Sequence, residues 1–253
     1  MTTVSERAAY VLAPNPGVMT LDGTNTYVLR ERDGARSVVV DPGPLDEHHL
    51  ARVLELAGDV ALVLVTHHHA DHTEAVPRFA ELTGAPTRAV SPEHCVGAEP
   101  LADGEVLDVD GLTIQVLHTP GHTADSACFL LPAEDVLLSG DTILGRGTTI
   151  VAHPDGRLGP YLDSLRAVQE LVVTGHVERI LPAHGPVIDD PATVVDFYLT
   201  HREERLEQVR QAVAAGAVTP QDVVERVYAD VDRALWPAAE RSVAAQLEHL
   251  RQS

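Results

Sequence analysis

The 253-residue chain contains no lysine, two cysteines and few aromatic residues, which make up 4% of the sequence. The two cysteines, Cys95 and Cys128, have no C-x-x-C partner and exclude a disulfide framework as the basis of the fold. No apolar run approaches the roughly 18–20 residues that a membrane-spanning helix needs, so we expect no membrane partner. Residues 1–10 lack the apolar stretch of a secretory signal, which favours a cytoplasmic protein.

Basic charge is scarce as well, since 18 arginines face 38 acidic residues and give a formal net charge of −20 at pH 7. Such a charge favours solubility and, on average, repels nucleic acid. It leaves a local basic groove open, because net charge does not describe how charge is distributed. Hydrophobic residues make up 44% of the chain, enough for one large domain or a large domain with a small appendage.

Strands and helices alternate in the pattern predicted for the first 190 residues. Asp110-Gly111 is a two-residue turn signal between two apolar runs, which predicts a β-hairpin. We expect strands at residues 26–29, 37–40, 60–65, 106–109, 112–117, 128–131, 136–138 and 179–181, and helices at residues 45–56, from residue 73 and at residues 161–172. This interleaving predicts an α/β domain of packed layers over residues 1–190.

The pattern changes to helices alone from about residue 191, which predicts a small helical C-terminal domain over residues 191–253. Thr219 is expected to cap a helix that begins at Pro220, and a further helix follows Pro237. In the first helix of this domain the apolar side chains fall on one stripe, with Arg202 at an intermediate position. The stripe comprises Val195, Leu199, Leu206, Val209 and Val213.

Four apolar runs each end in a polar loop that contains histidine or aspartate. These loops hold His67, His122, Asp141 and His184. Loops carried on a rigid sheet are frequent sites of function, and neighbouring strands can present their ends at one edge. We therefore expect these four side chains to converge on one spot.

The segment from His67 to His72 has a spacing that is typical of metal binding. In an extended segment residues i and i+2 face the same side, so His67 and His69 are predicted to hold one ion while His68 points elsewhere. Asp71 and His72 follow at the turn into a helix and are predicted to hold a second ion. Imidazole nitrogen and carboxylate oxygen are ligands that zinc prefers.

Asp141 is the predicted bridge between two zinc ions, because a shared aspartate holds two cations about 3.5–4 Å apart despite their repulsion. His122 completes the first site and His184 the second. His118 is left open as an outer support for a ligand. Asp41 has two interpretations of equal weight, as such a support or as part of an ordinary Asp-Pro-Gly turn. We interpret six further histidines as structural or surface residues: His68, His94, His153, His176, His201 and His249.

Four motifs, in family order along the chain, resemble those of the metallo-β-lactamase superfamily. They are T-H-x-H-x-D-H at residues 66–72, T-P-G-H-T at 119–123, S-G-D at 139–141 and P-x-H-G at 182–185. The resemblance implies an αββα sandwich with the active site at its edge. His69 stands where the di-iron flavoprotein branch has glutamate, which favours hydrolytic zinc over redox iron.

Nearly the whole chain resembles the lactamase-beta-2-like group within this superfamily. The resemblance is carried by N-P-G at residues 15–17, L-D-G-T-N-T-Y at 21–27, S-G-D-T-I-L-G at 139–145 and the C-terminal helices. It implies that residues 191–253 form a winged-helix-like domain and that Asn25, Thr148 and Thr149 contact the substrate. Members of the group include thioesterases of polyketide pathways and endoribonucleases that act on single-stranded RNA.

The predicted function is hydrolysis by a hydroxide bound to a dinuclear zinc site, with Asp71 orienting the water and passing a proton to the leaving group. A small-molecule thioester, ester or lactone suits the acidic composition best. One alternative is an endoribonuclease on single-stranded RNA that contacts phosphate through Arg202, Arg205 and Arg210, although the same arginines also suit a solvated face paired with glutamates. Further alternatives are a non-heme iron persulfide dioxygenase, a class that shares the H-x-H-x-D-H motif, and a binding module.

Overall fold

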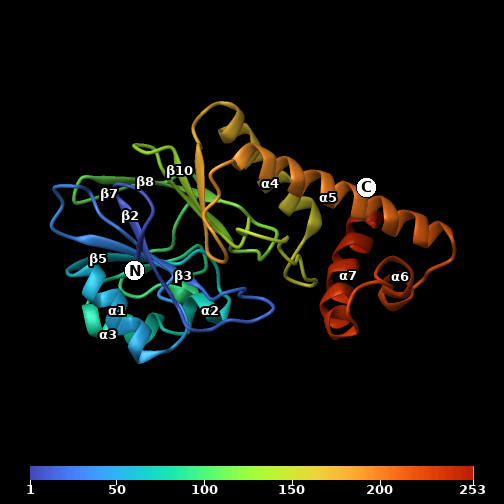
Figure 1. Cartoon of the computed structure of the whole chain (residues 1–253), viewed down its shortest axis with the longest axis horizontal. Helices are drawn as coiled ribbons and strands as arrows, with labels where there is room; N and C mark the ends of the chain where they lie inside the picture. The colour runs from blue at the N-terminus through green and yellow to red at the C-terminus, as the bar shows by residue number, and fades with distance from the viewer. Residues whose placement is uncertain (253) are drawn as a thin grey trace.

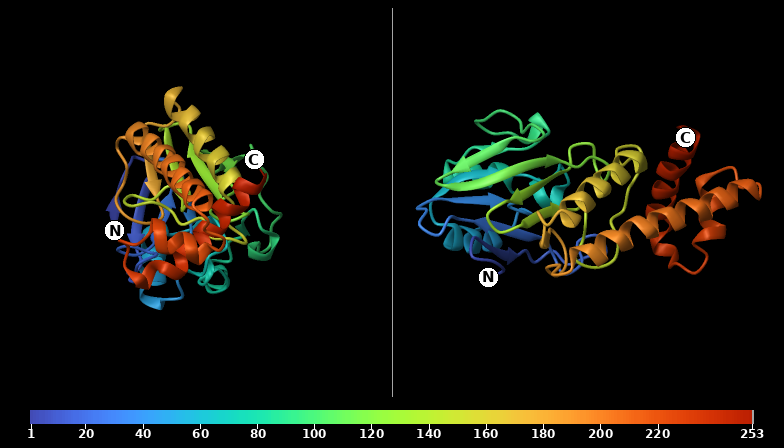
Figure 2. Two further views of the ribbon diagram at one scale, coloured as in Figure 1. Left: turned by 90° about the vertical axis from the view of Figure 1, so that its right-hand side faces the viewer. Right: turned by 90° about the horizontal axis from the view of Figure 1, so that it is seen from above.

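The computed structural model describes residues 1–252, in which two β-sheets pack face to face between outer helices and a helical unit follows at the C-terminal end (Figure 1). This is the αββα sandwich that the motifs imply. Seen from above, the long helix α5 (Pro191–Ala214) runs from the sandwich to the C-terminal unit (Figure 2). None of the helices within residues 1–252 combines the length and the apolar character that a membrane span requires.

The first sheet contains six strands in the order β1-β2-β3-β4-β5-β6. These are β1 (Thr2–Thr3), β2 (Ala8–Leu12), β3 (Asn25–Leu29), β4 (Ser37–Val40), β5 (Val60–Leu64) and β6 (Thr87–Arg88). Strands β1 to β4 pair antiparallel, whereas β4, β5 and β6 pair parallel. Helices α1 (Glu47–Ala57) and α3 (Val76–Thr83) cover the outer face through Leu50, Val53 and Phe79.

The second sheet contains five strands in the order β11-β10-β9-β8-β7. These are β7 (Val106–Val109), β8 (Leu112–His118), β9 (Ala127–Leu131), β10 (Val136–Gly140) and β11 (Arg179–Pro182). Strands β10 and β11 are parallel, and the other pairs are antiparallel. Helix α4 (Leu158–Val173) and the first half of α5 cover the outer face through Tyr161, Leu165 and Tyr198.

Strand β4 shows how one apolar run supports two layers. Val38 and Val40 pack into the core between the sheets, and Val39 packs against the helices, because successive side chains of a strand point to opposite faces. All three side chains are buried, as expected for a strand covered on both faces. Leu64 of β5 and Phe129 of β9 fill the same inter-sheet core from opposite sheets.

The two sheets meet closely at one edge of the sandwich, where β5 and β10 end. Gly140 has φ +50°, and a Cβ at this position would lie 2.8 Å from the Cβ of Thr66. A side chain there would therefore force the strand ends apart. Glycine at this position allows the loops that leave both sheets to share one site.

The C-terminal unit consists of the end of α5 together with α6 (Pro220–Val227), a short 3-10 helix (Arg233–Leu235) and α7 (Trp236–Gln252). As predicted, Thr219 caps α6: its side chain accepts a hydrogen bond from the Asp222 amide, and the Asp222 carboxylate accepts one from the Thr219 amide. Val209, Val223 and Val243 form a core that is separate from those of the sandwich.

Helix α5 belongs to both parts of the molecule, because Val195 and Tyr198 pack on the sandwich whereas Val209 packs in the C-terminal unit. The predicted stripe is wrong at its end. Val213 is 42% exposed, and Ala212 is buried in its place. On an α-helix with 3.6 residues per turn Val213 lies on the same side as Val195, so the period of the stripe is not the cause. Burial at this end follows the packing of the C-terminal unit, which contacts Val209 and Ala212.

Candidate metal centre

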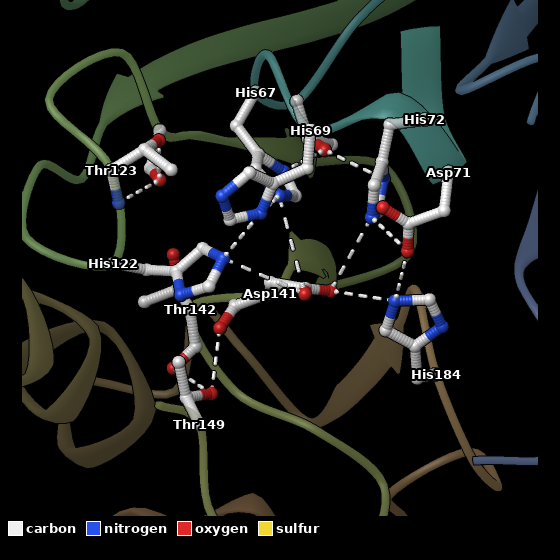
Figure 3. A network of polar contacts seen from close by, with 12 residues as sticks. His67, His69, Asp71, His72, His122, Thr123, Asp141, Thr142, Thr149 and His184 are labelled. Atoms are coloured by element: carbon white, nitrogen blue, oxygen red, sulfur yellow. Dashed lines mark hydrogen bonds and ion pairs between the residues drawn. The ribbon is translucent and has the colours of Figure 1, made fainter. Parts of the chain in front are cut away.

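The predicted ligands meet at the edge of the sandwich, in two groups with Asp141 between them (Figure 3). The ligand atoms of each group lie within 4.8 Å of one another. One group contains His67, His69, His122 and Asp141, and the other contains Asp71, His72 and His184. The convergence expected from four separate strand ends is therefore present.

Strand ends and the short helix α2 (Ala70–Thr73) position these side chains. The two groups come from the segment after β5, the helix α2, the β8–β9 loop and the segments after β10 and β11. Gly121, next to His122, has φ +138°, and a Cβ there would lie 2.3 Å from the Cα of Tyr161 in α4. Only glycine lets the loop that carries His122 lie this close to the helix.

In the first group, three imidazole nitrogens face a common point. His67 Nε2 lies 2.9 Å from His69 Nδ1, and His122 Nε2 lies 3.1 Å from the same atom. Asp141 Oδ2 lies 3.6 Å from His122 Nε2 and 4.0 Å from His67 Nε2. A tetrahedral zinc ion with bonds near 2.1 Å holds its ligand atoms about 3.4 Å apart, so these spacings suit one ion.

In the second group, one imidazole nitrogen lies between two carboxylates. His184 Nε2 is 3.2 Å from Asp71 Oδ2 and 3.3 Å from Asp141 Oδ1. His72 Nε2 completes the group, 3.4 Å from Asp71 Oδ2 and 3.7 Å from Asp141 Oδ1. Asp141 thus presents Oδ2 to the first group and Oδ1 to the second, as a bridging carboxylate does.

Burial keeps the histidines of the first group neutral. It lowers the pKa of His67 well below its usual value and that of His69 to about 4, with further lowering by neighbouring histidines. At His184 burial also lowers the pKa, but the charges of Asp141 and Asp71 outweigh it and raise the pKa to about 9. The second group therefore has the more strongly anionic surroundings, which favour the binding of a cation there.

Three buried atoms at the second group lack a hydrogen-bond partner: His72 Nε2, His184 Nε2 and Asp141 Oδ1. Burying polar atoms without partners is unfavourable, and ligation of a cation would satisfy all three together. The donor set consists of imidazole nitrogens and carboxylate oxygens, the ligands of catalytic zinc sites. The residues present therefore fit a dinuclear metal site.

Asp41 supports the ligands from behind. Its Oδ2 accepts a hydrogen bond from His72 Nδ1 at 2.8 Å, and Oδ1 accepts one from the Thr66 amide at 2.8 Å. The Thr66 hydroxyl donates to Asp41 Oδ2, so it is free to accept from His67 Nδ1 at 3.1 Å. These contacts turn the Nε2 atoms of both histidines toward the centre. Of the two interpretations of Asp41, the structure favours support of the ligands.

Backbone carbonyls orient two other ligands. His122 Nδ1 donates to Ile150 O at 2.8 Å, and His184 Nδ1 donates to Gly23 O at 3.1 Å. Asn25 belongs to this supporting layer, since its side-chain amide donates to Pro182 O at 2.9 Å and Gly185 O at 3.0 Å. Asn25 is only 2% exposed, so its predicted role in contacting substrate is wrong. It holds the loop of His184 instead.

Two histidines near the motifs do not reach the centre. His68 Nδ1 lies 2.8 Å from Asp125 Oδ1, which agrees with the expectation that it points elsewhere. His118, left open as an outer support, contacts the Ala124 carbonyl at 3.0 Å and touches no ligand. Asp125 was missed by the sequence reasoning, because nothing in its spacing distinguishes it from other loop aspartates.

A pocket of about 370 Å³ opens beside the first group, and His122 and Asp141 form part of its lining. Thr148 and Thr149 also line it. The Thr149 hydroxyl donates to the Asp141 carbonyl at 2.7 Å, which ties the pocket wall to the bridging residue.

The opposite wall of the pocket was missed by the sequence reasoning. It comes from α5 and the C-terminal unit and includes His201, Arg202, Arg205, Tyr228, Val231 and Leu235. Arg202 was expected on a buried stripe, and Arg202 and Arg205 were considered as phosphate contacts, but neither was placed at the metal centre. The approach of α7 and the loop after α6 depends on tertiary packing, which residue spacing does not encode.

Comparison with known proteins identifies the family. The model of the metallo-beta-lactamase superfamily matches residues 19–184, and that of the beta-lactamase associated winged helix domain matches residues 219–253. The lactamase-like protein aptB of Emericella nidulans is 35% identical, over 94% of this chain and 80% of its own length. The atrochrysone carboxyl ACP thioesterase of Aspergillus chevalieri is 34% identical, over 97% of this chain and 85% of its own length.

Solved structures agree on the fold of the whole chain. A metallo-beta-lactamase family protein from Thermus thermophilus superposes with a TM-score of 0.80 at 24% identity, covering 97% of this chain and 93% of that protein. The agreement therefore includes the C-terminal helices. With its matching motifs, fold and ligand groups, the chain belongs to the metallo-beta-lactamase superfamily and is a hydrolase of that superfamily with the associated winged helix domain.

Proposed function

We propose that this protein hydrolyses a thioester of a small-molecule acyl substrate with two zinc ions held at Asp141. The observation that carries the proposal is the position of Asp141, which joins the two ligand groups and lines the pocket. The likeness to an atrochrysone carboxyl ACP thioesterase, which covers nearly the whole chain, supports the thioester as substrate.

The chain's own residues supply binding and orientation around the bond to be cleaved. When bound, zinc ions supply a water of lowered pKa and polarise a carbonyl. The side chain of Asp71 is 26% exposed and that of Asp141 11% exposed, so Asp71 is the carboxylate that can reach both the water and the leaving group. We assign to Asp71 Oδ2 the orientation of the water and the transfer of its proton.

A thiolate leaving group suits the lining of this pocket. A thiol has a pKa near 8.5, so a thiolate leaves without a strong general acid. Among the described residues of the lining Asp141 is the only acidic side chain, and the surrounding charges hold its pKa at about 2. An ester or lactone, whose alkoxide is far more basic, depends more strongly on transfer of a proton from Asp71 to the leaving group.

The arginines considered for RNA do not form an exposed basic groove. Arg202 is buried, Arg205 lies over the ring of Tyr228, and Arg210 is paired with Glu207. The net charge of −20 adds a repulsive average field. A nuclease activity therefore gains no support from the positions of these residues.

A substrate panel with zinc-loaded protein tests the proposal. We expect turnover of acyl thioesters and far less of lactones, β-lactams or a single-stranded RNA, with two zinc ions per chain by elemental analysis. Cleavage of RNA without thioester turnover would contradict the proposal. Iron in place of zinc, together with oxygen consumption on a persulfide, would show a dioxygenase instead.

A further inference from the structure

The wall of the pocket on α5 holds an arginine that has no acidic partner. Arg202 is 7% exposed, and its guanidinium donates to the Thr149 carbonyl and lies 5.1 Å from the centre of the Tyr161 ring. Its Nε is buried without a hydrogen-bond partner. A buried cation without a counter-ion is unfavourable, so this atom needs a further acceptor.

Arg205, one turn further along α5, repeats this arrangement. Its guanidinium lies 4.4 Å from the centre of the Tyr228 ring and donates to Gln208 Oε1 at 2.9 Å. Within residues 1–252 no carboxylate lies within 4.0 Å of Arg202 or Arg205. Arg210 and Arg146 differ in this respect, because Arg210 is paired with Glu207 and Arg146 with Asp22.

His201 adds a neutral hydrogen-bonding group beside the two arginines of the pocket. Its Nδ1 is buried without a partner, and its ring lines the same wall. Burial, and then the charges of Arg202 and Arg205, lower its pKa to about 4, so the imidazole is neutral near pH 7. The two guanidinium charges therefore remain without compensation, and the imidazole can add a hydrogen bond to a ligand.

Apolar side chains also line the pocket. They include Met19, Leu144, Val231 and Leu235. A substrate that fills the pocket therefore needs an apolar body as well as groups that the metal centre and the arginines recognise. Among the described residues of the lining, Asp141 is the only acidic one, and it is already a ligand.

We propose that Arg202 and Arg205, with His201, bind a second anionic group, a carboxylate or a phenolate, of an acyl substrate whose body is otherwise apolar. This specificity subsite rests on the thioester hydrolysis proposed above and narrows its substrate class. It assigns to the C-terminal domain a part in choosing the substrate, because Tyr228 holds Arg205 against the pocket.

Matched thioesters test the subsite. The probes are N-acetylcysteamine monothioesters of α,ω-dicarboxylic acids, each compared with the neutral fatty acyl thioester of equal length. We expect zinc-loaded wild-type protein to favour the dicarboxylic member in kcat/KM by at least about 10-fold, the factor that one hydrogen bond to a charged group contributes. The difference in kcat/KM should come mainly from a lower KM for the dicarboxylic member. It should be greatest at one chain length of the acyl group.

Variants on α5 separate recognition from structure. Arg205→Gln is expected to remove most of the preference, with a much smaller effect on the neutral thioester, and Arg205→Lys is expected to keep part of it. Arg202→Gln should have the same effect on the preference if this variant folds. If it does not fold, Arg205→Gln still tests the subsite. Arg210→Gln, on the same helix but paired with Glu207 outside the pocket, is the matched control and should leave the preference unchanged.

Two results overturn the inference, and they differ from failure of the proposed function. Equal kcat/KM for both members of each pair would refute the anion subsite while thioester hydrolysis stands. Equal loss on both members in Arg205→Gln would show that Arg205 is only structural. Turnover of neither member by protein with both ions bound would refute the thioester proposal and the subsite with it.

Discussion

Asp141 contacts both ligand groups through different oxygens, Oδ2 toward His122 and Oδ1 toward His184. Asp141→Ala removes one donor from each group at once. We expect kcat/KM to fall by more than about 100-fold, since loss of an outer partner alone costs about 10- to 100-fold. Elemental analysis should show fewer than two ions per chain. Full metal content with retained turnover would contradict the bridging role.

Asp41 acts on the second ion through His72, which it orients without reaching the centre itself. Asp41→Asn keeps the size of the side chain but weakens this hydrogen bond. We expect an affinity for the second ion that is about 10- to 100-fold lower, measured by competition with a metal-sensitive dye. Asp46→Asn, at the cap of α1, is the matched control, and an equal loss there would show a general effect of removing a carboxylate.

His49 gives the fold a stability that depends on pH. It is 1% exposed, its Nε2 lies 2.9 Å from the Thr26 hydroxyl, and burial lowers its pKa from 6.5 to about 4. Between these values the unfolded chain binds more protons than the folded one, so this contribution is complete above pH 6.5 and is lost as the pH falls toward 4.

The shift at His49 corresponds to about 3 kcal/mol in the free energy of unfolding. In His49→Gln, whose amide can keep the contact with Thr26, the fall in stability from pH 7 to pH 4 should be smaller by up to that amount. Urea unfolding of both proteins across this range measures the difference. Parallel curves would show that His49 does not titrate on unfolding.

At the scale of elements, the β8–β9 loop depends on Gly121. Gly121→Ala would place a Cβ 2.3 Å from backbone atoms of Tyr161. We expect a loss of about 2–4 kcal/mol in stability, because backbone cannot move aside as a side chain can, together with weaker metal binding through displaced His122. Gly84→Ala is the matched control: φ is +68° but nothing lies within 4 Å, so only about 1–2 kcal/mol of backbone strain is expected. Equal losses in melting experiments would contradict the packing argument.

The strands and the ligand set were predictable from sequence because each ligand follows an apolar run. The run before His67 becomes β5, and the run before Asp141 becomes β10. The role of Asn25 was not predictable, since its partners Pro182 and Gly185 lie more than 150 residues away in the chain. The prediction for Val213 failed for another reason, because burial at the end of α5 depends on how the C-terminal unit packs on Val209 and Ala212.

At the scale of the whole molecule, the pocket is shared between the sandwich and the C-terminal domain. Residues from the loop 144–150, α5 and α7 lie along it together. Spacing along the chain predicted both domains but not that they meet at the active site, because the contact depends on how α5 and α7 pack. The net charge of −20 left a local basic site open without locating it, and two arginines without a carboxylate partner among residues 1–252 lie in this one pocket.

Two cations are expected on either side of Asp141. Anomalous diffraction at the zinc edge, on crystals of the zinc-loaded protein, would locate them. We expect two peaks about 3.5–4 Å apart, one among His67, His69 and His122 and one among Asp71, His72 and His184, each within reach of a different oxygen of Asp141. A single peak, or two peaks without Asp141 between them, would contradict this expectation.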